Sequence, residues 1–350
     1  MCIILITALV LFPDTAMDSA FRGYLLFVRN VFPALFPFAV CISFLKRNGS
    51  FDCNKQSGGI RGFFGIILIS ILSGAPSGSL MIDAAYGDNG NGPLLPQEKR
   101  SILSAFLNLS GPAFVLGTVC RNMLGSKSNS VLLLVAAAHY GTAAIMSLSY
   151  YLICCKNEIR TGKIEYQTET EEKRRFCQTL SKALLDACKI MIVIVANIVV
   201  FSVIAGFVNS LPFLRSIQPV IIRPITAMIE ITAGINSIAE LAIDYRFKLS
   251  LICFLLSLGG ICIAMQVGSI VKTCIKEYLF AKLLLSLLSA VTCYTLFPVF
   301  LKHEQAAFSV NDISNAAIRF FSVGELALMV FMSSVAACLA AVFSARRTKS

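Results

Sequence analysis

The chain contains no tryptophan, only two histidines and few charged residues, and each shortage excludes a class of protein or site. Charged residues make up 14% of the sequence, against about 25% in a soluble domain, which excludes a soluble fold. None of the 13 cysteines forms a Cys-x-x-Cys pair, so ligands at metal-site spacing are missing, and we expect neither a metal site nor a cofactor. Without tryptophan, the nine tyrosines and 26 phenylalanines must anchor the chain at the membrane interface.

Hydrophobic residues are abundant instead. They make up 57% of the chain, and the mean hydropathy is +0.78, which predicts an all-α polytopic membrane protein in the lipid bilayer. The net charge of +11 does not indicate a nucleic-acid partner. The Lys and Arg residues lie mostly in short loops beside apolar segments, as retention of positive charge on the cytoplasmic side predicts. No basic stripe interleaved with aromatic residues is present in the sequence.

Four apolar segments are interrupted, two in each half of the chain. The segments 66–85, 102–124, 220–242 and 250–271 are broken at 74–78, 108–112, 230–234 and 259–260 respectively. A bilayer tolerates a broken helix only where protein or an aqueous cavity satisfies the freed N–H and C=O groups. Short, Gly/Pro-interrupted segments at corresponding places in two halves are typical of the binding site of a transporter.

The charge distribution predicts how the two halves are arranged. Uninterrupted apolar segments cover 1–12, 24–45, 131–155, 187–211, 283–301 and 325–343. The polar stretch 156–182 is taken as a cytoplasmic linker between an N-terminal half, 1–155, and a C-terminal half, 183–350. Most of the 30 Lys and Arg residues fall on one face if 46–61, 86–100, 156–182, 272–282 and 344–350 are cytoplasmic. The halves are then two inverted repeats with broken or re-entrant helices.

The breaks in the first half are candidate ligand sites. A half-helix that begins at either break would present free N–H groups and a positive dipole end, which suits a carboxylate. Ser77 and Ser79 add hydroxyl groups at the first break, and Asn108 and Ser110 add an amide and a hydroxyl at the second. A Gly/Pro kink that serves only helix packing is the open alternative.

The second half supplies a charged candidate. Glu230 lies in a mostly apolar run, and a carboxylate at bilayer depth costs at least a few kcal/mol, so it is a candidate for binding a coupling cation or proton. Pairing with Arg223 or hydration at a shallow hairpin tip are the alternatives. Thr232, Asn236 and Gln266 are neutral side chains able to orient a ligand, or to bond a neighbouring helix instead.

Two residues bear on an enzymatic function. Ser77 beside Gly78, with His139 in a later segment, is similar to the Ser–His dyad of rhomboid-type intramembrane proteases. The interval from Gly74 to Ser77 is one residue too long for their Gly-x-Ser-Gly motif, and Pro76 precedes the serine directly. We therefore expect that the protein is not an enzyme.

Five runs carry a family resemblance. They are 30–38 (NVFPALFPF), 73–79 (SGAPSGS), 108–114 (NLSGPAF), 230–235 (EITAGI) and 259–266 (GGICIAMQ), in order along most of the chain. In these runs the chain resembles the YlbJ-type sporulation integral membrane proteins, which belong with the nucleoside-recognition, or gate domain, proteins. Ser79 departs from the pattern, since a small residue such as alanine is expected there.

The resemblance implies a role in endospore formation. Members of this family are linked to moving dipicolinic acid across the outer forespore membrane, so it implies a transporter of a small organic anion at that membrane. Dipicolinate is a planar dianion, which half-helix N-termini suit. A carrier of nucleosides or other metabolites and a non-transporting sporulation scaffold stay open. So do homo-oligomers and complexes with other sporulation membrane proteins.

Overall fold

The protein is helical throughout the part that this computed structural model describes, namely residues 2–47, 60–87, 94–156, 176–210, 228–229 and 231–301. These ranges contain helices and turns and no strand. Four helical stretches in them are long and apolar enough to cross a membrane: Asn129–Cys155, Cys177–Ser210, Tyr245–Ile270 and Ile275–Phe300. The chain is an all-α polytopic membrane protein, as its composition predicts.

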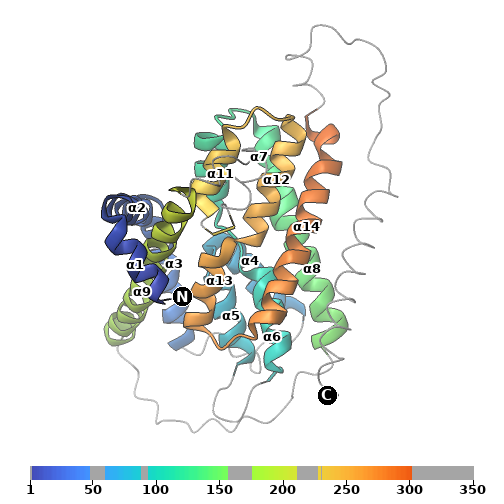
Figure 1. Cartoon of the computed structure of the whole chain (residues 1–350). Helices are drawn as coiled ribbons and strands as arrows, with labels where there is room; N and C mark the ends of the chain where they lie inside the picture. Colours follow the sequence, from blue (N-terminus) through green and yellow to red (C-terminus); the bar gives the residue numbers. More distant parts are fainter. Residues whose placement is uncertain are drawn as a thin grey trace, which may run out of the picture.

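A peripheral layer lies along one side of the molecule (Figure 1). It consists of α1 (Cys2–Leu11), α2 (Pro13–Leu26), η1 (Phe27–Val31), α3 (Phe32–Arg47) and α9 (Phe176–Ser210). Both α2 and α3 pack along α9. Small residues allow α2 to approach closely: a Cβ atom on Gly23 would lie 2.6 Å from the Ser202 hydroxyl oxygen, and one on Gly206 would overlap Ser19.

The first repeat contains a helical hairpin, a broken helix and a long rod. The hairpin is α4 (Ile60–Ser73) with α5 (Ser77–Tyr86), and the broken helix is α6 (Gln97–Leu107) with η2 (Ala113–Met123). The rod comprises α7 (Asn129–Ala136), η3 (Ala137–Gly141), α8 (Thr142–Tyr150) and η4 (Tyr151–Cys155). Pro76 and Pro112 directly precede α5 and η2, where a residue without an N–H group costs no helical hydrogen bond.

The second repeat follows the same order. A turn at Met228 and Ile229 precedes α11 (Ile231–Ala239), and α12 (Tyr245–Leu258) with α13 (Gly260–Ile270) forms the broken helix. Helix α14 (Ile275–Phe300) takes the place of the rod. Figure 1 shows α5 and α6 at one end of the molecule and α11 and α12 at the opposite end. The repeats are therefore inverted relative to each other.

Helix α14 connects the two repeats because it packs against α6, α8, α7 and α12. Two clusters of buried apolar side chains lie along it. The cluster at the α5–α6 end includes Met81, Ile102, Phe106, Tyr278 and Leu285. The cluster at the α11–α12 end includes Val119, Leu134, Ile235, Ile252 and Phe297. These two clusters form the core that holds the broken helices in place.

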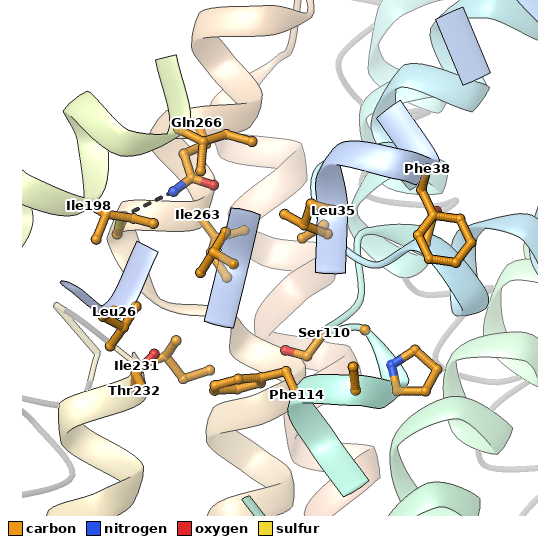
Figure 2. A pocket seen from close by; sticks show the side chains of 18 of the residues that line it. Leu26, Leu35, Phe38, Ser110, Phe114, Ile198, Ile231, Thr232, Ile263 and Gln266 are labelled. Carbon is orange, nitrogen blue, oxygen red and sulfur yellow. Dashed lines mark hydrogen bonds between the residues drawn. The ribbon is translucent and has the colours of Figure 1, made fainter. Parts of the chain in front are cut away.

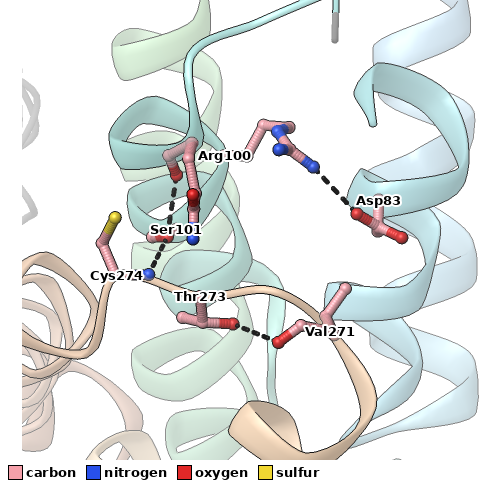
Figure 3. A network of polar contacts seen from close by, with 7 residues as sticks. Asp83, Arg100, Ser101, Val271, Thr273 and Cys274 are labelled. Carbon is pink, nitrogen blue, oxygen red and sulfur yellow. Dashed lines mark hydrogen bonds and ion pairs between the residues drawn. The ribbon is translucent and has the colours of Figure 1, made fainter. Parts of the chain in front are cut away.

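A polar network ties the repeats together at the α5–α6 end (Figure 3). Arg100 on α6 forms an ion pair with Asp83 on α5, with 2.8 Å between Nη1 and Oδ1. The backbone N–H of Cys274, in the turn between α13 and α14, donates to the Ser101 hydroxyl over 2.8 Å. Arg100 and Ser101, in one turn of α6, thus bond to α5 of the first repeat and to the α13–α14 turn of the second repeat.

Two predicted boundaries differ in the structure. The segment predicted over 283–301 begins at Ile275, so the assignment of Lys282 to the loop 272–282 was wrong, and Lys282 lies within α14 with 1% of its surface exposed. The predicted segment began after Lys282 because this one cation interrupts the apolar run. Helix α9 begins at Phe176, so residues 176–182 of the predicted linker are helical. The division into halves stays a prediction, and the predicted span 325–343 lies outside the described residues.

Candidate functional site

The two breaks of the first repeat lie backbone against backbone. At Gly74, φ is +76°, and a Cβ atom there would lie 2.8 Å from the backbone nitrogen of Gly111. A Cβ atom on Gly78 would overlap the carbonyl group of Leu107. Only glycine permits this approach, which places the start of α5 beside the end of α6.

The second repeat forms the equivalent contact with hydrogen bonds. Gly259 and Gly260 both have positive φ, 77° and 74°, which ends α12 and starts α13 within two residues. The N–H group of Ile261 donates to the Met228 carbonyl over 2.7 Å. The Met228 carbonyl thus accepts from an N–H group at the start of α13, so this N–H group is not free for a ligand.

A pocket opens between the peripheral layer and the two repeats (Figure 2). It holds about 840 Å³ of empty space, counting its open mouth. Its walls come from α2, η1, α3 and α9 on one side and from the breaks and α11 and α13 on the other. The lining residues are Leu26, Val31, Leu35, Phe38, Leu72, Ser73, Ala75, Ser110, Gly111, Pro112, Ala113, Phe114, Ile194, Ile198, Ile231, Thr232, Cys262, Ile263 and Gln266.

Two half-helices begin at this pocket. Residues 110–114 carry the chain into η2, and Ile231 and Thr232 are the first residues of α11. A helix N-terminus carries about half a positive charge, so the two repeats each direct a positive dipole end to the same space. No lining residue in the described pocket has a charged side chain.

Three of the predicted ligand residues meet in the pocket. Ser110, Thr232 and Gln266 line it from the second break, α11 and α13, and each is less than a tenth exposed. Figure 2 shows them around a common space together with the ring of Phe114. The Gln266 amide nitrogen has a weak partner, the Cys262 sulfur at 3.4 Å, so its polar end is available to a ligand at little cost.

The other predicted residues lie elsewhere. Ser77 and Ser79 are buried on α5 and do not line the pocket, and the Ser79 hydroxyl has no hydrogen-bond partner among the described residues. Asn108 is buried at the end of α6 and does not line the pocket. Asn236 is exposed and donates to Glu240 over 3.3 Å. Glu230 lies outside the described residues.

A buried polar cluster outside the pocket lining was not predicted. The Lys282 ammonium group donates to the backbone carbonyl of Asn108 over 2.5 Å and to that of Ser257 over 3.1 Å. The Ser257 hydroxyl pairs with Nδ1 of His139 over 2.8 Å. His139, which a protease dyad would pair with Ser77, therefore bonds a different serine. Apolar residues also precede Lys282 directly, so the predicted span could have been extended back from Leu283 to include this lysine.

Comparisons with known proteins do not assign this chain to a family. No protein-family model, no curated protein and no solved structure matches this chain.

Proposed function

We propose that this integral membrane protein is a carrier of a small organic anion, with alternating access around the pocket between the peripheral layer and the repeats. One observation carries the proposal: the N-termini of η2 and α11, one from each inverted repeat, begin at the same pocket. A site at the junction of inverted repeats is reached from either side when one group of helices moves against the other.

The chemistry of the pocket narrows the class of ligand. The two dipole ends favour a carboxylate, and the Ser110 hydroxyl and the Gln266 amide supply hydrogen bonds. Phe38 and Phe114 add aromatic walls. A flat aromatic acid satisfies both halves of this description, because its ring contacts the apolar walls while its carboxylate meets the helix ends.

Dipicolinate is the first substrate to test, since it is a flat aromatic acid and the family resemblance implies it. The outer forespore membrane is the corresponding proposed location. Glu230 is the proposed coupling residue, because a carboxylate in an apolar run near the start of α11 is suited to carry a proton. The proposed role is transport, not catalysis.

The test is uptake of labelled dipicolinate into liposomes that contain the purified protein. We expect saturable uptake that Ser110→Ala lowers about tenfold, because one hydrogen bond to a charged ligand is lost. Asn236→Ala is the matched control, since Asn236 is a predicted polar residue that lies outside the pocket, and it should leave uptake unchanged. Uptake equal to that of empty liposomes would contradict the proposal.

A nucleoside carrier is the second candidate. The uncharged, mostly apolar lining favours it, since a nucleoside presents a flat base and neutral hydroxyl groups. Competition separates the two: excess nucleoside abolishes the uptake of labelled dipicolinate only if both occupy the same pocket with comparable affinity. A scaffold would transport neither compound and would tolerate Ser110→Ala without any loss of function.

A further inference from the structure

We propose that the Lys282 ammonium group is a built-in cation that joins the carbonyl ends of the two broken helices and makes an inorganic cation unnecessary there. The proposal goes beyond the carrier function, because it concerns what holds the two breaks together. It needs neither a substrate nor transport to be true.

The position of Lys282 is the first argument. The residue lies on α14, which packs against the broken helices of both repeats, and 1% of its surface is exposed. Its two acceptors are the carbonyl of Asn108, directly after α6, and that of Ser257, in the last turn of α12. One ammonium group therefore caps the C-terminal ends of two half-helices that come from opposite repeats.

Charge compensation is the second argument. A helix C-terminus carries about half a negative charge, so two such ends offer one positive charge nearly full compensation. No ion pair to a carboxylate is recorded for Lys282 within the described ranges. A buried ammonium without partners would be strongly unfavourable, and the two carbonyl groups supply what a carboxylate would otherwise provide.

The comparison with ion-coupled carriers is the third argument. In transporters with broken helices, unwound carbonyl groups and half-helix C-termini coordinate the coupling cation. Here the same kind of ligand set is filled by a side chain of the protein itself. Lys282 is thus a positioning residue: it holds Asn108 and Ser257, and through them the breaks, without contact with the pocket.

The test restores the missing cation from solution. Lys282→Ala leaves both carbonyl groups without a donor and opens a space of the size of n-propylammonium. We expect Lys282→Ala to have a lower thermal unfolding midpoint than the wild type in detergent, and n-propylammonium to raise that midpoint by several degrees. The same amine should leave the midpoint of the wild type unchanged, because Lys282 already fills the site.

Two variants serve as controls. Lys276→Ala removes an exposed lysine from the same helix and should respond to the amine no more than the wild type does. Lys282→Met fills the space without a charge, so it should lose stability and show no rescue. Equal stability of Lys282→Met and the wild type would overturn the proposal, as would a Lys282→Ala midpoint that the amine does not raise. If Lys282→Ala yields no folded protein, the result for Lys282→Met decides.

Discussion

The amide nitrogen of Asn108 donates to the hydroxyl oxygen of Tyr278 over 2.7 Å, in the buried centre of the molecule. Asn108 follows α6 of the first repeat, and Tyr278 lies on α14 of the second, one turn before Lys282. The bond therefore crosses between the repeats at a helix break. It also means that the amide nitrogen of Asn108, a predicted ligand residue, is bonded within the protein. The buried Oδ1 atom of the same amide has no hydrogen-bond partner among the described residues.

The first prediction concerns this bond. Asn108→Ala should lower the free energy of unfolding by about 1–3 kcal/mol, because it leaves the buried Tyr278 hydroxyl without its partner. Tyr278→Phe removes the same bond, so the double variant should lose less than the sum of the two single losses. Denaturation of all three variants measures this coupling. Fully additive losses would show that the two residues act independently.

The second prediction concerns the close approach of α5 to α6. Gly78→Ala should destabilise the protein severely, because the new Cβ atom would overlap the carbonyl of Leu107 and neither backbone can yield easily. Gly65→Ala on α4 is the control, since no atom lies within 4 Å of a Cβ atom at that site. That control should be neutral or gain up to about 1 kcal/mol from helix propensity. Equal midpoints for the two variants would refute the packing of the breaks.

The third prediction concerns the ion pair at the α5–α6 end. Asp83→Asn should lower stability by about 1–3 kcal/mol, because the mostly buried guanidinium group of Arg100 loses its carboxylate. Glu98→Gln removes a carboxylate from the first turn of α6 and should cost less than about 1 kcal/mol. Thermal unfolding of both variants checks the order. A larger loss for Glu98→Gln would mean that the pair contributes little.

The fourth prediction concerns the driving ion. If Lys282 supplies the cation at the helix breaks, uptake should run at the same rate when sodium is replaced by potassium or choline. A proton gradient should still change the rate, through Glu230, and Glu230→Gln should abolish that response while leaving exchange of substrate across the membrane. Uptake measured in liposomes with defined ion gradients distinguishes these cases. A strict requirement for sodium would contradict proton coupling through Glu230.

Three of the four break positions were predictable from local sequence, whereas the break predicted at 230–234 was wrong for residues 231–234, which lie in α11. Glycine and proline interrupt apolar runs at 74–76, 108–112 and 259–260, and these residues end helices for reasons of backbone geometry alone. The inverted arrangement followed from the same breaks together with the distribution of positive charge. Ser110, Thr232 and Gln266 line one pocket in the structure, and their role as ligand residues stays a prediction.

Helix α2 and the burial of Lys282 were not predicted, because both depend on contacts that hydropathy does not encode. Helix α2 was not predicted because Asp14, Asp18 and Arg22 lower its hydropathy, yet its small residues pack on α9 and help to build the peripheral layer. Lys282 was assigned to a loop because a lysine in an apolar run costs free energy unless distant carbonyl groups accept its hydrogen bonds. Those carbonyl groups belong to residues 25 and 174 positions away.

The central claim, that the pocket is the transport site, is tested most directly by filling it. Ala113 lines the pocket and is exposed to it, so Ala113→Trp should occupy the space and abolish saturable dipicolinate uptake while the unfolding midpoint stays that of the wild type. Ala196→Trp, at an exposed position of α9 that does not line the pocket, should transport normally. Undiminished uptake by folded Ala113→Trp protein would contradict the account.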